Sequence, residues 1–185
     1  MRASRVLLTF AGTALVVVAL GLASGCYKQQ AVDPSATEAM TALVELAGTI
    51  WNEGNLELID DLVAPGYARH VVDISEDVVG TVGFGEALVA IRTQFPDFRV
   101  VFDEVIVAGD TIVLRWTVTG TDTGTFGELP PTGMSIHISG ASVIRVVDGK
   151  YAEEWMYYNE GAMMKQLGFT LVPPAMEVVE EEAAR

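Results

Sequence analysis

The stretch SIHISGASVIRVVDGKYAEEWMYYN, residues 135–159, decides the fold, because it contains two long strands joined by the strongest hairpin signal in the chain. Apolar and polar residues alternate along it, as they do in a strand whose two faces meet different surroundings. Asp148-Gly149 favours the tight turn of a hairpin. Strands joined by such a turn are antiparallel, so residues 135–147 and 150–159 are predicted to be antiparallel neighbours.

Upstream of this hairpin the sequence predicts two more strands, preceded by helices. Gly109-Asp110 is a turn signal between the two strands, and apolar residues recur at helical spacing earlier in the chain. The sequence therefore predicts an α+β fold, in which three N-terminal helices wrap a curved antiparallel sheet and leave a cone with an open end. The predicted strands are 67–72, 98–107, 111–121, 135–147 and 150–159, and the predicted helices are 35–51, 56–63, 84–95 and 160–167.

The N-terminus has the pattern of a secretory signal. Arg2 and Arg5 precede an apolar run from residue 6 to about 22, and small residues follow. The run is long enough for a retained membrane anchor, which is the alternative. Ala23-Ser24-Gly25 before Cys26 resembles a bacterial lipobox, which implies a lipid on Cys26; a plain signal peptide is the other alternative. We expect a signal peptide at 1–25, a tether at 26–35, and a membrane-anchored lipoprotein of the cell envelope, on the periplasmic or extracytoplasmic face.

Composition excludes several classes of function. The formal net charge is −14, and no basic patch or phosphate-binding glycine loop is visible, so we expect no nucleic-acid partner. Cys26 is the only cysteine, which excludes disulfides and cysteine-based metal sites once it is lipidated. The two histidines, His70 and His137, lie on different elements without metal-ligand spacing, so no metal site is expected. Residues 170–185 are predicted to be an acidic tail.

Several short motifs in a fixed order resemble one family. The element order resembles the nuclear-transport-factor-2-like cone, and within it the SnoaL-like polyketide cyclases and ester cyclases. The resemblance implies a SnoaL-like domain over residues 36–169, without a cofactor. The motifs are Trp51-Asn52-Glu53-Gly54-Asn55, Tyr67-Ala68-Arg69-His70, Gln94-Phe95-Pro96-Asp97-Phe98, Ala108-Gly109-Asp110, Gly120-Thr121-Asp122-Thr123-Gly124, Leu129-Pro130-Pro131-Thr132-Gly133, Asp148-Gly149-Lys150, Glu153-Glu154-Trp155 and Gln166-Leu167-Gly168.

The resemblance also implies which face of the last strand lines the cavity. Along residues 150–159 alternate side chains share a face, and the family pattern places the Trp155 face inward. Asn159 would then lie deeper in the cone. The ligand-pocket residues expected on this basis are Trp51, Trp116, Glu153, Trp155 and Tyr157.

The candidate catalytic residues are His70, Asp122 and Asn159. In the family, a carboxylate usually occupies the Asn159 position, and histidine commonly occupies the Asp122 position. An amide does not exchange protons near neutral pH, so acid–base work would shift to Asp122, His70 or Glu153. The structural alternatives are a turn-forming Asp122 and a His70 that closes the cone mouth.

Three hypotheses about function remain open at this stage. The first is a cofactor-independent cyclase or isomerase that acts by proton transfer. The second is an envelope lipoprotein whose cone binds a small hydrophobic molecule. The third is a non-catalytic interaction module that forms a homodimer through its open sheet face.

Overall fold

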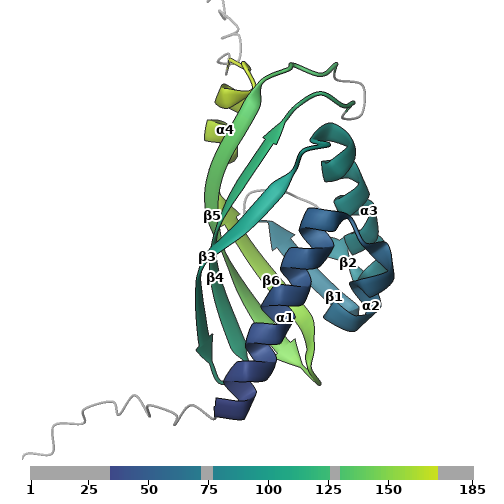
Figure 1. The fold of residues 1–185 in the computed structure, drawn as a ribbon, viewed down its shortest axis with the longest axis vertical. Helices are drawn as coiled ribbons and strands as arrows, with labels where there is room; N and C mark the ends of the chain where they lie inside the picture. The colour runs from purple at the N-terminus through teal and green to yellow at the C-terminus, as the bar shows by residue number, and fades with distance from the viewer. Residues whose placement is uncertain (1–33, 72–76, 126–129, 171–185) are drawn as a thin grey trace, which may run out of the picture.

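The computed structural model describes residues 34–71, 77–125 and 130–170 (Figure 1). The predicted signal peptide, Cys26 and nearly all of the predicted acidic tail lie outside the described residues. Within these ranges the helical elements are α1 (Pro34–Glu53), η1 (Leu56–Leu58), α2 (Ile59–Leu62), α3 (Gly80–Gln94) and α4 (Glu160–Gln166). The strands are β1 (Val63–Val71), β2 (Val78–Val79), β3 (Arg99–Ala108), β4 (Thr111–Thr121), β5 (Ser135–Val147) and β6 (Lys150–Tyr158).

The strands form one sheet in the order β2-β1-β6-β5-β4-β3. The run β3 to β6 is antiparallel throughout, as predicted. Asp148 and Gly149 both have positive φ, 51° and 73°, which is the geometry of the hairpin turn that their sequence favours. β1 adds to the sheet in parallel to β6, so the α+β prediction is confirmed with a mixed sheet.

The predicted first and last residues of the strands are most accurate in the middle of the sheet. Several elements nearer its edges begin or end at other residues than predicted. β4 and β5 have the predicted bounds, whereas β1 begins at Val63 and the preceding helix ends at Leu62. Pro65 therefore lies inside β1 and does not end a helix. α3 begins four residues earlier than predicted, at Gly80, and β6 ends at Tyr158 because Asn159 caps α4.

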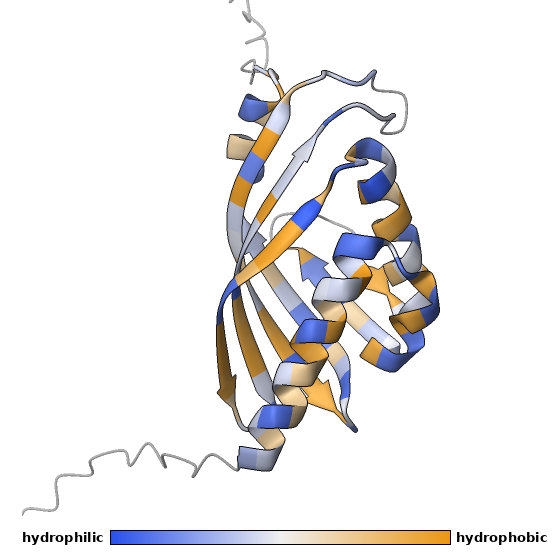
Figure 2. Ribbon diagram, viewed as in Figure 1, coloured by the Kyte–Doolittle hydropathy of each residue, from blue (hydrophilic) through white to orange (hydrophobic). Residues whose placement is uncertain are grey.

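One face of the curved sheet is covered by α1, α2 and α3, while α4 lies at one end of β5 (Figure 1). Hydrophobic and hydrophilic residues alternate along β5, as Figure 2 shows. Ile136, Ile138 and Ile144 of β5 are buried, and His137 between the first two is exposed. Among residues 34–71, 77–125 and 130–170, no helix is long and apolar enough to cross a membrane.

Trp116 and Gly140 are in close contact where β4 pairs with β5. The two residues are partners across β4 and β5, and the indole lies over the glycine. A Cβ on Gly140 would meet Trp116 Cη2 at 2.4 Å and the Tyr157 carbonyl oxygen at 2.6 Å. Residue 140 must therefore be small for the indole to reach its place in the core.

We expect Gly140→Ala to lower the free energy of unfolding by about 1–3 kcal/mol, because the added methyl group overlaps a rigid ring and a backbone oxygen. Denaturant titration followed by circular dichroism measures this change. Gly66→Ala is the matched control, since a Cβ there meets nothing within 4 Å. Equal stability of the two variants would contradict the proposed close contact.

Candidate functional site

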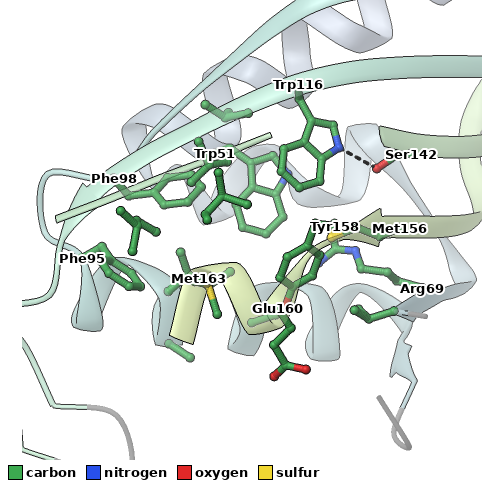
Figure 3. A pocket seen from close by; sticks show the side chains of 18 of the residues that line it. Trp51, Arg69, Phe95, Phe98, Trp116, Ser142, Met156, Tyr158, Glu160 and Met163 are labelled. Atoms are coloured by element: carbon green, nitrogen blue, oxygen red, sulfur yellow. Dashed lines mark hydrogen bonds between the residues drawn. The ribbon is translucent and has the colours of Figure 1, made fainter. Parts of the chain in front are cut away.

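A cavity of about 530 Å³ lies between the helices and the inner face of the sheet (Figure 3). Its volume falls within the range of roughly 300–1,000 Å³ that is usual for small-molecule sites. Most of its lining is apolar or aromatic, and a few polar side chains interrupt it. The apolar lining includes Trp51, Phe84, Phe95, Phe98, Phe102, Leu114, Trp116, Ile138, Met156, Tyr158 and Met163, and the polar lining includes Arg69, Asp122, Ser142 and Glu154.

A buried polar cluster of Tyr67, Arg69 and Glu154 forms part of the cavity wall. The parallel pairing of β1 with β6 sets Arg69 opposite Glu154, and both are nearly inaccessible, at 3% and 6% exposure. Arg69 Nε donates to Glu154 Oε2 and to the Tyr67 hydroxyl oxygen, at 3.1 Å in each case. The Tyr67 hydroxyl in turn donates to Glu154 Oε2. The opposite charges therefore neutralise each other inside the fold.

Aromatic rings surround the Arg69 guanidinium. Its Cζ atom lies 4.9 Å from the ring centroid of Phe84 and 5.0 Å from that of Trp51. Rings at this distance attract a cation and also exclude water from it. The Arg69 charge is thus held in an apolar environment.

Tyr67, within this cluster, and Tyr151, beside it, differ in their hydrogen bonding. Burial raises the pKa of Tyr67 well above its usual value, and Glu154 adds to the rise despite the opposing charge of Arg69, so the phenol stays protonated. Burial and the charge of Glu154 also raise the pKa of Tyr151. The Tyr151 hydroxyl has no hydrogen-bond partner among the described residues, although the side chain is only 3% exposed.

The other buried polar groups of the cavity are paired within the protein. The Trp116 indole donates to Ser142 Oγ at 3.1 Å, as the dashed line in Figure 3 marks. Asp122 Oδ2 accepts from the Thr132 backbone N–H and hydroxyl at 2.9 and 2.7 Å. Asp122 thus lines the cavity, and its hydrogen bonds are those of a residue that fixes a loop.

The structure places the predicted pocket residues on two sides of the sheet. Trp51 and Trp116 line the cavity as predicted. The prediction that Glu153, Trp155 and Tyr157 also line it is corrected, because these side chains lie on the outer face. The physical reason is a bulge between the pairs Val146–Tyr151 and Arg145–Glu153, which shifts the alternation of β6 by one residue. Tyr151, Glu154, Met156 and Tyr158 line the cavity instead.

His70 also lies outside the cavity, within a polar group on the outer face. Its Nδ1 lies 2.9 Å from Asp77 Oδ1, and its Nε2 lies 3.2 Å from Glu153 Oε1. Arg145 Nη2 donates to Glu153 Oε2 at 2.9 Å. The hydrogen bonds to Asp77 and Glu153 raise the pKa of His70. These contacts tie β1 to β6 at the surface.

Asn159 does not reach into the cone. It is exposed, and its Oδ1 accepts from the Ala162 backbone N–H at 2.8 Å as the N-cap of α4. Its placement deep in the cavity is therefore also corrected. Asparagine is among the preferred N-cap residues, which accounts for the amide at this position.

The predicted site residues did not include Tyr67, Arg69 or Glu154. Tyr67 and Arg69 are two apart and so share one strand face, which was a usable signal. Their partner Glu154 follows from the parallel pairing of β1 with β6, a contact between residues 85 positions apart. Within the described ranges, no group of three or more His, Cys, Asp or Glu residues is arranged to hold a metal ion.

The cone with its internal cavity defines the class of protein, and the comparisons define the family. A family model described as SnoaL-like polyketide cyclase matches residues 41–167, and the chain belongs to this family. Among curated proteins, none matches this sequence.

Solved structures share the fold. TsrD from Streptomyces laurentii is 23% identical over 74% of this chain and 98% of its own, with a TM-score of 0.64. AclR from Streptomyces galilaeus is 27% identical over 75% of this chain and 86% of its own, with a TM-score of 0.62. A protein from Catenulispora acidiphila with a ketosteroid isomerase-like fold is 15% identical over 71% and 97%, with a TM-score of 0.59.

We expect Tyr67→Phe to destabilise the protein by about 1–3 kcal/mol, because it removes a hydroxyl that bonds both members of a buried ion pair. Tyr151→Phe is the matched control. It removes a hydroxyl without a partner and should leave stability unchanged or raise it. Thermal and denaturant unfolding measure both. A larger loss from Tyr151→Phe than from Tyr67→Phe would contradict this hydrogen-bond pattern.

Proposed function

We propose that the chain binds a small, mainly apolar molecule inside its cone. The observation that carries the proposal is the cavity of about 530 Å³, whose wall is apolar except for a few polar groups. Burial of apolar ligand surface against such a wall supplies the main driving force for binding. Membership of the SnoaL-like family supports a small organic molecule as the ligand.

Cyclase-type proton transfer on that molecule is the second candidate function. It is favoured by one observation, the Glu154 carboxylate in the cavity wall. Both hydrogen bonds that Glu154 receives end at Oε2, so Oε1 has no donor among the described residues. An acceptor in this position can take a proton from a bound molecule.

The test of binding is native mass spectrometry, with extraction of small molecules, on residues 27–185 purified from the source cells. We expect an apolar compound to co-purify and to be lost on unfolding. Turnover of that compound is then compared between Glu154→Gln and Glu153→Gln, adjacent residues on opposite faces of β6. Loss of turnover in Glu154→Gln alone supports the proposal that the protein is an enzyme. If the wild type shows no turnover, the proposal that it only binds the molecule is the one supported.

The same experiment tests the interaction-module alternative. Val101, Ile106 and Tyr157 are exposed on the outer sheet face, at 48%, 52% and 46%, and a partner copy would cover them. An empty protein that takes up no apolar dye and sediments as a tight dimer would overturn the binding proposal in favour of this module.

We also propose that the domain is held at the outer side of a membrane by a lipid on Cys26, which the lipobox-like sequence 23–26 supports. We expect the full chain expressed in bacteria to incorporate an alkyne-labelled fatty acid and to sediment with membranes. Cys26→Ser should lose the label and shift the protein to the soluble fraction, unless an uncleaved apolar segment holds it. Label retained by Cys26→Ser would show that the lipid proposal is wrong.

A further inference from the structure

We propose that Arg69 is the residue that recognises the ligand, and that its Nη nitrogens donate to a carbonyl-type oxygen of a neutral, mainly apolar molecule. The inference rests on the proposed binding function and adds the chemical class of the ligand. It assigns Glu154 and Tyr67 as positioning residues for the Arg69 side chain.

Arg69 has N–H donors that make no hydrogen bond with the described residues. A guanidinium has five N–H donors in a fixed planar fork. Both hydrogen bonds of Arg69 leave from Nε, and the described residues offer no acceptor to Nη1 or Nη2. Arg69 lines the cavity, so an acceptor on a ligand is the available partner. Among the described residues only the Tyr151 hydroxyl is fully buried without a partner, so the Arg69 Nη nitrogens are accessible from the cavity and can donate to a ligand oxygen.

The Arg69 guanidinium is held in one orientation. Glu154 and Tyr67 fix Nε, while Phe84 and Trp51 contact the guanidinium at 4.9 and 5.0 Å from its Cζ atom. The Nη groups are thereby set in place before a ligand arrives. Donors fixed in advance bind more strongly, because less side-chain entropy is lost on binding.

The charges already present in the cavity wall favour one kind of ligand oxygen. Arg69 and Glu154 already form a neutral pair inside an apolar wall. A ligand carboxylate would add an unbalanced negative charge to this environment, within a chain of net charge −14. A ketone or ester oxygen accepts the same hydrogen bond and adds no charge. The site therefore favours a neutral oxo compound over an acid.

Several of the other polar groups in the lining are already paired within the protein, whereas the Tyr151 hydroxyl has no partner among the described residues and is a second available donor. Ser142 and Trp116 bond each other, and Asp122 is occupied by Thr132. Figure 3 shows Arg69 beside Met156 and Tyr158 at one end of the drawn pocket, with Phe95 and Phe98 toward the other. A ligand would thus place its oxygen at Arg69 and its apolar part toward the phenylalanines.

Three naphthalenes of similar shape test the inference on the folded domain, residues 27–185. They are 2-acetylnaphthalene, 2-ethylnaphthalene and 2-naphthoate, measured by equilibrium dialysis at pH 7.5. We expect the ketone to bind about tenfold more tightly than the hydrocarbon, as a hydrogen bond to a charged donor predicts, and the carboxylate to bind most weakly. The carbonyl stretching band of the bound ketone should shift to lower wavenumber than in an alkane solvent.

The variant Arg69→Met/Glu154→Met removes both charges together, which avoids leaving one buried and unpaired. Arg145→Met/Glu153→Met is the matched control, because it removes the Arg–Glu pair on the outer face of the same sheet. We expect the first variant to lose the preference for the ketone while it still binds 2-ethylnaphthalene. The control should keep the preference.

The outcomes separate this inference from the function on which it rests. If none of the naphthalenes binds, the binding proposal fails and the inference fails with it. If all bind but the wild type shows neither a ketone preference nor a band shift, Arg69 recognition is overturned and the cavity stands. The band shift is measured on the wild type, so the inference stays testable even if the double variant does not fold.

Discussion

The burial of one ion pair, Arg69 with Glu154, constrains the arrangement of the whole domain. Removing two charges from water costs several kcal/mol each, and only close pairing with further hydrogen bonds offsets that cost. β1 must therefore lie against β6 in the one register that sets Arg69 beside Glu154. That register closes the cone, because it joins the end of the helical region to the last strand. Tyr67 completes the cluster from the same face of β1.

A second Arg–Glu pair, between β5 and β6, shows why position matters more than composition. Arg145 and Glu153 pair on the outer face, where side chains are partly solvated and such a pair contributes little. Glu153 and Glu154 are chain neighbours with opposite environments, separated only by the thickness of the sheet. The bulge in β6 decides which of them faces inward. A shift by one residue would exchange the two, so the position of the bulge determines which glutamate pairs with Arg69.

The parts of the fold that the sequence predicts are those set by local chemistry. β4 and β5 have their predicted bounds because strict alternation and the Asp148-Gly149 turn lie within a few residues of each other. The pairing of β1 with β6 depends on contacts some 85 residues apart, which no local period encodes. The face of β6 that lines the cavity was assigned from the family resemblance, and a bulge between Tyr151 and Glu153, which no residue type signals, turns the face of Glu154 inward instead. Trp51 and Trp116 line the cavity, and the polar cluster of Tyr67, Arg69 and Glu154 was not among the predicted site residues.

Two residues of the family motifs, Asn52 and Asp97, fix the shape of the cone. Asn52 exchanges two hydrogen bonds with the backbone of Val100, which fixes the end of α1 on β3. Asp97 accepts from the Thr121 backbone and hydroxyl, which ties the end of α3 to β4 and lowers the pKa of that carboxyl. Neither residue lines the cavity. Other motif residues, among them Trp51, Phe95 and Glu154, line the cavity, so the motifs contribute both to the shape of the cone and to its lining. For this chain, selectivity then depends on the shape of an apolar space and on the few polar atoms that interrupt it.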